Sequence, residues 1–345
     1  MARAIPLSTR TQVDTAGAVL VRPTMQDDLD SALEIINNWR ASHSFPLNTF
    51  QIWLKKRARE IDPTSLVAQR IKRLSSIRLK LSRFPSIRLS QMQDIGGCRA
   101  VLGSVKKVDE LVARYKNSDL KHKLDHMDDY IRTPKESGYR GVHLIYRYLS
   151  DRSATYNGLK IEVQLRSPMQ HAWATAVETV GTFTRQALKS SFGEADWLRF
   201  FALMGTAIAR KEGTQIVPKT PTTLKELRAE LREHNRRLDV ENHLQTYGYA
   251  LQAVEESSAN QRAHYFLLEL DATAQKLRIK GYKSSELAQA SNDYLATEKD
   301  MSTSGGDAVL VSVESVGALR RAYPNYYMDT HVFIDAVRDA LSQKA

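Results

Sequence analysis

The 345-residue chain has a single cysteine, Cys98. One cysteine excludes an internal disulfide framework and any zinc site built on two or four cysteines, so the sequence predicts a reducing compartment, the cytoplasm. No hydrophobic run approaches the ~18 residues of a membrane-spanning helix. The longest run near the start, Ala16 to Val21, is also too short for the core of a signal peptide. We therefore expect no membrane partner.

Two common signatures of nucleotide binding are missing as well. The sequence contains neither a glycine-rich P-loop ending in Gly-Lys-Ser/Thr nor a Gly-x-Gly-x-x-Gly fingerprint. A bound nucleotide would therefore depend on basic residues and on loops of another kind. Hydrophobic residues make up 42% of the chain and aromatic residues 8%. That composition is typical of a folded globular protein.

Positive charge is concentrated in the first part of the chain. Residues 1–215 carry 34 Lys and Arg against 21 Asp and Glu, whereas residues 216–345 carry 16 against 18. The excess is densest over residues 50–90, where only Glu60 and Asp62 oppose eleven basic residues. This asymmetry indicates that the N-terminal part handles a polyanion, either the phosphates of a nucleotide or a nucleic acid.

Hydrophobic periodicity predicts a mixed α/β domain before residue 215. Apolar residues three and four positions apart predict helices over residues 25–60, 64–82, 106–118, 169–183 and 197–209. Alternating or continuous apolar runs predict strands over residues 98–102, 142–148 and 159–165. Two prolines in residues 217–222 then predict a linker. We expect one domain over residues 1–215 and an accessory domain over residues 216–345.

The second part of the chain also has a mixed pattern. An amphipathic stripe over residues 222–257 predicts helix, followed by a hairpin over 264–270 and 276–280, a helix over 284–301, a strand over 308–313 and two helices ending at Leu341. The stripe could pack within its own chain, which we favour, or pair with another copy. The sequence thus predicts a C-terminal α/β accessory domain that is regulatory or oligomerising, with a possible homo-oligomer.

Three polar residues share one face of the strand at 161–166. Alternation places Glu162, Gln164 and Arg166 together on that face. Asp94 precedes Gly96 and Gly97 at the start of another strand, and two carboxylates on neighbouring strands can hold Mg²⁺ through oxygen. Each carboxylate also has a structural alternative. Asp94 could cap a turn, and Glu162 could pair with an arginine, Arg99 or Arg166.

A second group of candidate ligands lies just before the loop at residues 133–138. His122 and His126 are four residues apart beside Asp125, Asp128 and Asp129, which is the spacing of metal ligands on a helix. No further ligand motif accompanies them. We therefore favour a solvated acidic segment over a metal site here.

Five segments, in order, resemble the synthetase domain of the RelA/SpoT alarmone synthetases, specifically the small synthetase-only members. Residues 70–80 look like the basic ATP-binding helix, 93–99 the metal-binding Asp motif, 129–143 the acceptor-binding loop, 161–167 the catalytic strand and 169–178 the helix that follows it. The resemblance implies an α/β (α+β) fold with a nucleotidyltransferase-like mixed sheet flanked by helices. It also implies transfer of pyrophosphate from ATP to a ribose 3′-hydroxyl, which leaves AMP.

The resemblance further implies a role for each matching residue. Asp94 and Glu162 resemble the Mg²⁺ carboxylates, and Glu162 also resembles the base for the attacking hydroxyl. The implied donor-side residues are Arg70 and Arg99, which would sandwich adenine, and Lys72, Ser76 and Lys80, which would contact phosphate. The implied acceptor-side residues are Lys135, Tyr139, His143, Gln164 and Arg166, with Tyr139 stacking on the acceptor base.

The sequence leaves the acceptor open. Gly141-Val142 stands where the family usually has Ser-Leu. With GDP or GTP as acceptor the product is a (p)ppGpp-type alarmone, which is our leading prediction. Toxic small synthetases that pyrophosphorylate the 3′ end of tRNA have a similar core, and the basic first part would suit tRNA. A catalytically silent nucleotide-sensing module is the third possibility, although the intact Asp94 and Glu162 pair argues against it.

Overall fold

The structure is a computed structural model that describes residues 4–23, 25–118, 120–187, 194–244, 252–255, 263–271, 276–304, 307–313, 316–323 and 330–342. Its strands are β1 (Leu66–Ile71), β2 (Gly96–Val101), β3 (Lys123–Asp129), β4 (Val142–Arg147), β5 (Lys160–Arg166), β6 (Gln252–Glu255), β7 (Tyr265–Asp271), β8 (Lys276–Tyr282) and β9 (Asp307–Ser312). All of these strands join one mixed sheet in the order β3-β4-β5-β2-β1-β9-β7-β8-β6. The predicted mixed α/β class is confirmed.

The helices are distributed over both faces of this sheet and around its ends. They are α1 (Arg10–Val21), α2 (Gln26–Ser42), α3 (Ser44–Ile61), α4 (Leu74–Arg83), α5 (Val105–Lys116), α6 (Pro168–Ala187), α7 (Glu194–Lys211), α8 (Leu224–Leu238), α10 (Leu287–Ser304), α11 (Val316–Ala322) and α12 (His331–Ser342). None of the described helices is long and apolar enough to cross a membrane.

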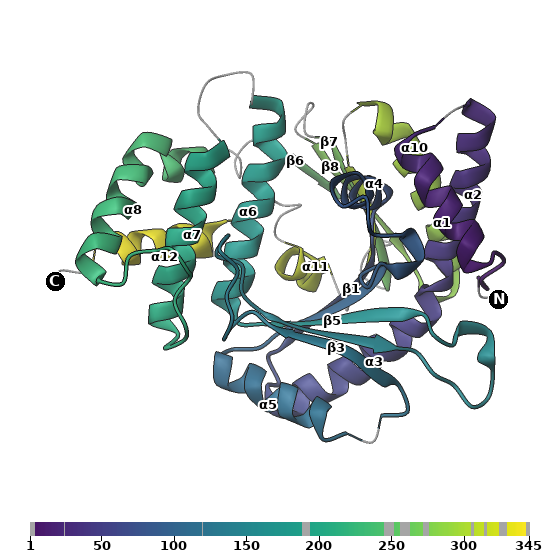
Figure 1. The fold of residues 1–345 in the computed structure, drawn as a ribbon, viewed down its shortest axis with the longest axis horizontal. Coiled ribbons are helices and arrows are strands. Elements are labelled where there is room, and N and C mark those ends of the chain that lie inside the picture. Colours follow the sequence, from purple (N-terminus) through teal and green to yellow (C-terminus); the bar gives the residue numbers. More distant parts are fainter. Residues whose placement is uncertain are drawn as a thin grey trace.

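Two helices cover the lower face of the β1 to β5 half of the sheet. Figure 1 shows α3 and α5 beneath the strands and α4, α6 and α11 on the opposite side. The covered face is apolar: a Cβ added to Gly96 on β2 would lie 2.9 Å from Ile161 Cδ1 on β5 and 3.6 Å from Leu47 Cβ on α3. Because side chains alternate along a strand, the polar residues of β5 must leave from the other face, between α4 and α6.

The helix predicted over residues 64–82 is wrong in its first half. Residues Leu66–Ile71 form β1, which pairs with β2 on one side and with β9 on the other, and the helix begins only at Leu74. The backbone hydrogen bonds of a central strand are made with the strands on either side of it. A short apolar run in such a strand cannot be distinguished from the apolar stripe of a helix by its spacing alone. Arg70 therefore lies on a strand, Lys72 in the connection, and Ser76 and Lys80 on α4.

Two other helical interpretations are also corrected. The stripe over residues 222–257 is helical as α8, but residues 252–255 form β6, which pairs with β8. Residues 123–129 form strand β3, so His122 and His126 do not share a helix. His126 Nε2 lies 2.9 Å from Asp128 Oδ1, and the ring of His122 stacks on that of Tyr148 with 4.8 Å between the ring centroids.

The C-terminal part shares both the sheet and a core cluster with the first part. Strand β9 pairs with β1, and a hydrophobic cluster joins α6 and α7 to α8 and α12. The segment predicted as a linker packs on α7, because the Val217 amide and the Thr220 hydroxyl both bond to Thr206 Oγ1, at 3.0 and 2.6 Å. The division of the chain at residue 215 stays a prediction.

Candidate active site

Strand register collects the polar residues on one face of the sheet. Gly97 on β2 lies opposite Arg70 on β1 and Glu162 on β5. Two residues further on, Arg99 lies opposite Gln164, which in turn lies opposite His143 on β4. Residues at such opposed and next-but-one positions point to the same side of a sheet. These five side chains, predicted to act together, therefore leave from the face between α4 and α6.

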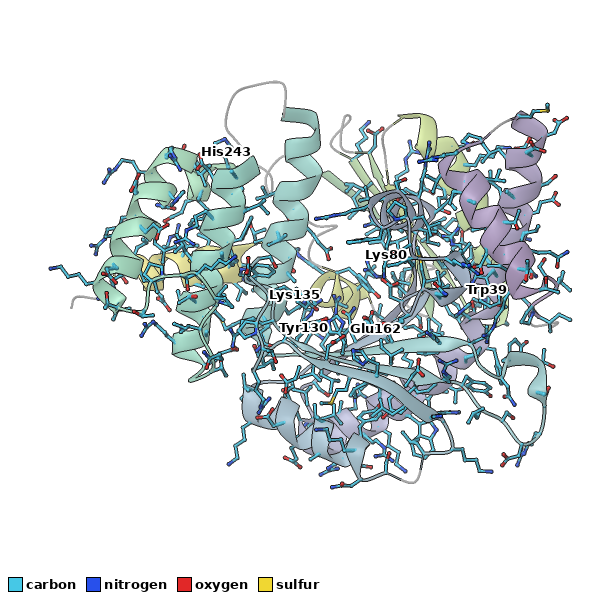
Figure 2. All side chains as sticks on the ribbon, in the orientation of Figure 1. Trp39, Lys80, Tyr130, Lys135, Glu162 and His243 are labelled. Carbon is cyan, nitrogen blue, oxygen red and sulfur yellow. The ribbon has the colours of Figure 1, made fainter. Side chains whose placement is uncertain are left out.

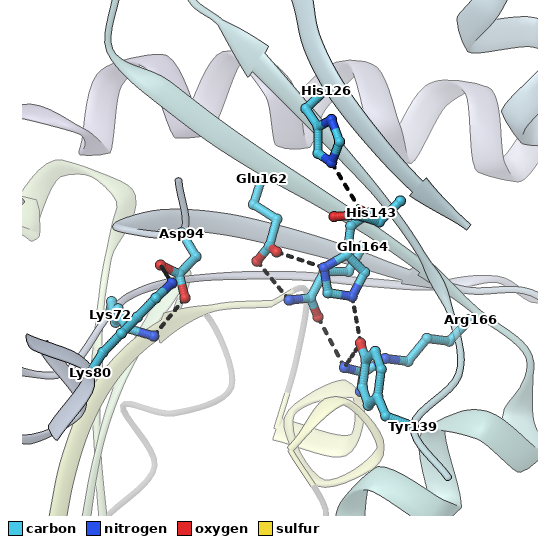
Figure 3. A network of polar contacts seen from close by, with 10 residues as sticks. Lys72, Lys80, Asp94, His126, Tyr139, His143, Glu162, Gln164 and Arg166 are labelled. Atoms are coloured by element: carbon cyan, nitrogen blue, oxygen red, sulfur yellow. Dashed lines mark hydrogen bonds and ion pairs between the residues drawn. The ribbon is translucent and has the colours of Figure 1, made fainter. Parts of the chain in front are cut away.

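Glu162 is a buried carboxylate with a bonded partner for each oxygen (Figure 3). His143 Nδ1 lies 2.8 Å from Oε1, and Gln164 Nε2 donates to Oε2 at 2.7 Å. Burial by itself would raise the pKa of Glu162, but the contact with His143 outweighs it and lowers the pKa. Glu162 is therefore ionised at neutral pH and can accept a proton. Its partners are not the arginines that the sequence offered as an alternative.

Asp94 is held between two lysines from different elements. Lys72 Nζ lies 2.6 Å from Oδ2, and Lys80 Nζ on α4 lies 3.1 Å from Oδ1. Burial would raise the pKa of Asp94, but the two ammonium groups lower it to about 2. Figure 3 shows Asp94, just before β2, and Glu162, on β5, directed toward the same space. Asp94 thus gathers the cations of the predicted donor side beside Glu162.

The Tyr139 hydroxyl links the loop before β4 to strand β5. It lies 2.5 Å from His143 Nε2, and it accepts a hydrogen bond from Arg166 Nη2 at 2.8 Å. In the neutral imidazole whose Nδ1–H donates to Glu162, Nε2 is an acceptor and the hydroxyl donates to it. With this tautomer, donation runs in one direction from Arg166 through Tyr139 and His143 to Glu162. This orientation keeps the imidazole fixed beside the carboxylate.

Cations and aromatic rings gather on the predicted acceptor side. The Lys135 ammonium lies 4.2 Å from the ring centroid of Tyr130 and 5.6 Å from that of Tyr139. Figure 2 shows Tyr130 and Lys135 on the α7 side of Glu162 and Lys80 on the α4 side. Tyr130 belongs to the loop that the sequence singled out, but no role was predicted for it. The signal that could have identified it was an aromatic residue within the matched segment 129–143.

Arg166 has unused hydrogen-bonding capacity. It is only 5% exposed, and among the described residues its Nε and Nη1 have no acceptor. Its Nη2 also donates to Gln164 Oε1 at 3.2 Å. Buried donors are nearly always paired in native proteins, so these N–H groups are left for a water or for an oxygen of a ligand.

Arg99 is engaged by the C-terminal part of the chain. Its Nη2 donates to the carbonyl oxygen of Ala322, and its guanidinium lies 5.4 Å from the ring centroid of Tyr323. The Tyr323 hydroxyl donates to the Gln69 carbonyl at 2.8 Å. Burial, together with the nearby charge of Arg166, lowers the pKa of Arg99 to about 10. The end of α11 therefore covers the face where the sequence predicted adenine between Arg70 and Arg99.

The structure thus brings the predicted residues into one region. Ser76 lies on α4, one turn before Lys80. The described residues contain no group of three or more His, Cys, Asp and Glu that could hold a metal ion. Asp94 and Glu162 supply two carboxylates, the oxygen donors that Mg²⁺ prefers, so the donor chemistry fits that ion.

Comparison with known proteins identifies the class. Residues 69–183 match the family described as "Region found in RelA / SpoT proteins". The chain therefore contains a RelA/SpoT synthetase domain. It is distantly related to GTP pyrophosphokinases of Bacillus subtilis (strain 168). Identity to YwaC is 27% over 164 residues, covering 44% of this chain and 77% of that protein. Identity to YjbM is 31% over 118 residues, covering 33% of this chain and about half, 54%, of that protein.

Solved structures of small alarmone synthetases show a similar partial overlap. Small alarmone synthetase 2 from Bacillus subtilis is 22% identical, covering 50% of this chain and 94% of its own, with a TM-score of 0.41. Small alarmone synthetase 1 from the same organism, bound to its product pppGpp, is 19% identical, covering 61% and 99%, with a TM-score of 0.39.

Proposed function

We propose that this protein transfers the β,γ-pyrophosphate of ATP to the 3′-hydroxyl of GDP or GTP and makes a (p)ppGpp-type alarmone. The observation that carries the proposal is the ionised Glu162 carboxylate between the lysines around Asp94 and the aromatic loop at Tyr139. A base between a cluster of lysines and a group of aromatic rings suits the transfer of a phosphoryl group onto a nucleoside hydroxyl. The printed names of the relatives, GTP pyrophosphokinases, support the same reaction.

Each side of the site has a task in this reaction. Glu162 accepts the proton of the 3′-hydroxyl, and His143 and Gln164 keep its carboxylate oriented. Lys72 and Lys80 exchange Asp94 for the donor phosphates and neutralise their charge, which is the main requirement of phosphoryl transfer. Asp94 and Glu162 would hold Mg²⁺, which when bound supplies further neutralisation of phosphate charge.

The acceptor side is expected to hold a purine nucleotide. Tyr139 offers a ring face for stacking, and Lys135 beside it can reach the acceptor phosphates. The relative solved with pppGpp supports a guanine nucleotide. The excess of basic residues in residues 1–215 would also suit tRNA, so the test includes deacylated tRNA as an acceptor.

We also propose that residues 216–345 regulate this site. The Ala322 carbonyl and the Tyr323 ring lie on Arg99, one of the two residues assigned to adenine. A nucleotide that stacks on Arg99 must displace them. This arrangement supports restraint of the synthetase by its own C-terminal part.

The test is a transfer assay with γ-labelled ATP and four acceptors in parallel: GDP, GTP, ATP and deacylated tRNA. We expect the label to appear in a guanine nucleotide. Glu162→Gln should lower the rate of transfer roughly 10²- to 10⁴-fold, because it removes the base but little volume. ATP binding should stay within a few-fold in that variant. Label only in tRNA would replace the acceptor assignment. Absence of label from every acceptor, with ATP still bound, would support the silent sensing module.

A further inference from the structure

Arg40 on α2 is a buried cation whose hydrogen-bonding groups are all used. It is only 2% exposed. Nε donates to the Lys72 carbonyl at 3.0 Å, and Nη1 donates to Asn37 Oδ1 at 3.0 Å and to Glu298 Oε2 at 2.7 Å. Nη2 donates to Glu298 Oε1 at 3.1 Å and to the Tyr294 hydroxyl. A guanidinium has five N–H groups, so this one joins three chain segments without leaving a donor unpaired.

Glu298 on α10 makes a second contact at the connection between β1 and α4. Its Oε1 accepts the amide hydrogen of Leu74, the first residue of α4, at 2.7 Å. A carboxylate is favourable there, because the first amides of a helix have no partner within the helix and carry partial positive charge. The Tyr294 hydroxyl also donates to Oε1, at 2.8 Å. The carboxylate is thereby fixed against both Arg40 and the start of α4.

These contacts determine where Lys72 and α4 lie. The Lys72 amide donates to the Ile95 carbonyl at 2.8 Å, while its own carbonyl accepts from Arg40. The backbone of Lys72 is thus held from two sides, and its side chain reaches Asp94. Any shift of the Lys72 carbonyl or the Leu74 amide would move the Lys72 ammonium, and Lys80 with the rest of α4.

We propose that Arg40 and Glu298 are positioning residues for ATP. The buried pair fixes the backbone from Lys72 to Leu74, and because Glu298 belongs to α10, ATP binding depends on the C-terminal part of the chain. The inference rests on the proposed function, which assigns Lys72 and Lys80 to the donor phosphates. It gives residues 216–345 a supporting role at α10 that is separate from the restraint at Tyr323.

The test compares Arg40→Met, Glu298→Leu and the double variant in the full chain. Calorimetric titration with a non-hydrolysable ATP analogue gives Kd, and thermal unfolding gives Tm. Each single variant leaves one charge buried and unpaired, so it should lower Tm and raise Kd at least fivefold, the lower end of usual coupling between sites. The double variant should recover Tm, because no lone charge remains.

The double variant decides between positioning and stability. It leaves the Lys72 carbonyl and the Leu74 amide without their partners, so we expect its Kd to remain at least fivefold raised although Tm has recovered. Recovery of both Tm and Kd would show that the pair acts through stability alone and would overturn the proposal.

Asp293→Asn is the matched control on the same helix. Asp293 binds Lys280 Nζ at 2.7 Å and the Tyr282 hydroxyl at 2.8 Å. It therefore anchors α10 to β8, away from the backbone of residues 72–74. Its Kd for the ATP analogue should stay within twofold of the unaltered chain. An effect as large as that of Glu298→Leu would overturn the specific role of the pair.

Hydrogen exchange at the Leu74 amide separates this proposal from the proposed function. Exchange should be faster in Glu298→Leu and in the double variant than in Asp293→Asn. If the unaltered chain binds no ATP analogue, the proposed function is rejected, and faster exchange in Glu298→Leu would still show that the pair fixes the backbone at Leu74. If the unaltered chain binds the analogue, unchanged exchange in Glu298→Leu would reject the positioning role alone.

Discussion

At the scale of single residues, Tyr139 has two parts with separable roles. Stacking of its ring on the acceptor base stays a prediction of the resemblance, and in the structure the Arg166 guanidinium lies 5.2 Å from the ring centroid. The hydroxyl adds a link between Arg166 and His143 that the sequence did not predict, because it depends on residues 27 and 4 positions away meeting in space.

Substitutions at Tyr139 should therefore have two distinct effects. Tyr139→Ala should raise the acceptor KM roughly 5- to 150-fold, the equivalent of ~1–3 kcal/mol of stacking. Tyr139→Phe keeps the ring but leaves His143 Nε2 without its donor, so we expect kcat to fall while the acceptor KM changes little. Steady-state kinetics with varied acceptor distinguish the two. A Phe variant with an unchanged kcat would show that the hydroxyl does not orient His143.

His43, between α2 and α3, should make stability depend on pH. Its imidazole is 1% exposed, and Nδ1–H donates to the Trp39 carbonyl at 2.7 Å. Burial lowers its pKa to about 4, so between pH ~6.5 and ~4 the unfolded state binds the proton more readily. The free energy of unfolding should therefore fall as pH drops through this window, by a few kcal/mol in all.

Denaturant unfolding at pH 7 and pH 5 measures this effect. His43→Asn keeps an N–H donor near the Trp39 carbonyl but cannot be protonated, so it should reduce the loss of stability between the two pH values. An equal loss in both proteins would show that His43 does not carry the dependence.

At the scale of elements, the acceptor loop depends on the close approach of two glycines. Gly138 has a φ of +92°, and a Cβ on Gly205 of α7 would lie 2.8 Å from the Gly138 Cα and 2.9 Å from its carbonyl oxygen. Both contacts are with backbone, so the loop must move to make room. The loop carries Lys135 and Tyr139, and its packing on α7 therefore sets where the acceptor binds.

Gly205→Ala should displace this loop. We expect a rise in the acceptor KM of up to roughly 10²-fold, the usual scale for misplacing a binding group by about 1 Å. The ATP KM should change little, because the donor residues lie on β1, α4 and β2. Gly181→Ala on α6 is the control: its added Cβ would meet nothing within 4 Å. Equal kinetics in the two variants would show that the Gly138 contact is not limiting.

At the scale of the whole molecule, a fragment that ends at Thr214 tests whether the first part of the chain folds and is active without residues 216–345. If residues 216–345 only restrain the site, the fragment should be more active than the full chain. In the structure, such a fragment loses the β9 partner of β1 and the α8 and α12 half of a shared core cluster. An open strand edge and an exposed apolar face favour aggregation.

We therefore expect the 1–214 fragment to be insoluble or inactive, as judged by size-exclusion chromatography and the transfer assay. Tyr323→Ala in the full chain is the better test of restraint, because it removes the ring over Arg99 without opening the sheet. It should lower the KM for ATP. A soluble fragment as active as the full chain would remove both the restraint and the support assigned to residues 216–345.

The sequence by itself determined most of the catalytic strand and the order of the motifs. Alternation along residues 161–166 placed Glu162, Gln164 and Arg166 on one face, and the structure joins Glu162 to Gln164 and Gln164 to Arg166 there. This pattern is local, because side chains of a strand alternate whatever the strand packs against. The helices that follow, α6 and α7, were likewise predicted from their own periodicity.

Only the tertiary structure decided which distant segments meet. Residues 66–71 become a strand because β2 and β9 pair with them on both sides, whereas their own spacing also suited a helix. Tyr323 reaches Arg99, and Glu298 reaches Arg40 across 258 positions, with no mark at either position in the sequence. Such contacts depend on the shared sheet that brings the two parts of the chain together, and local propensity carries no information about that pairing.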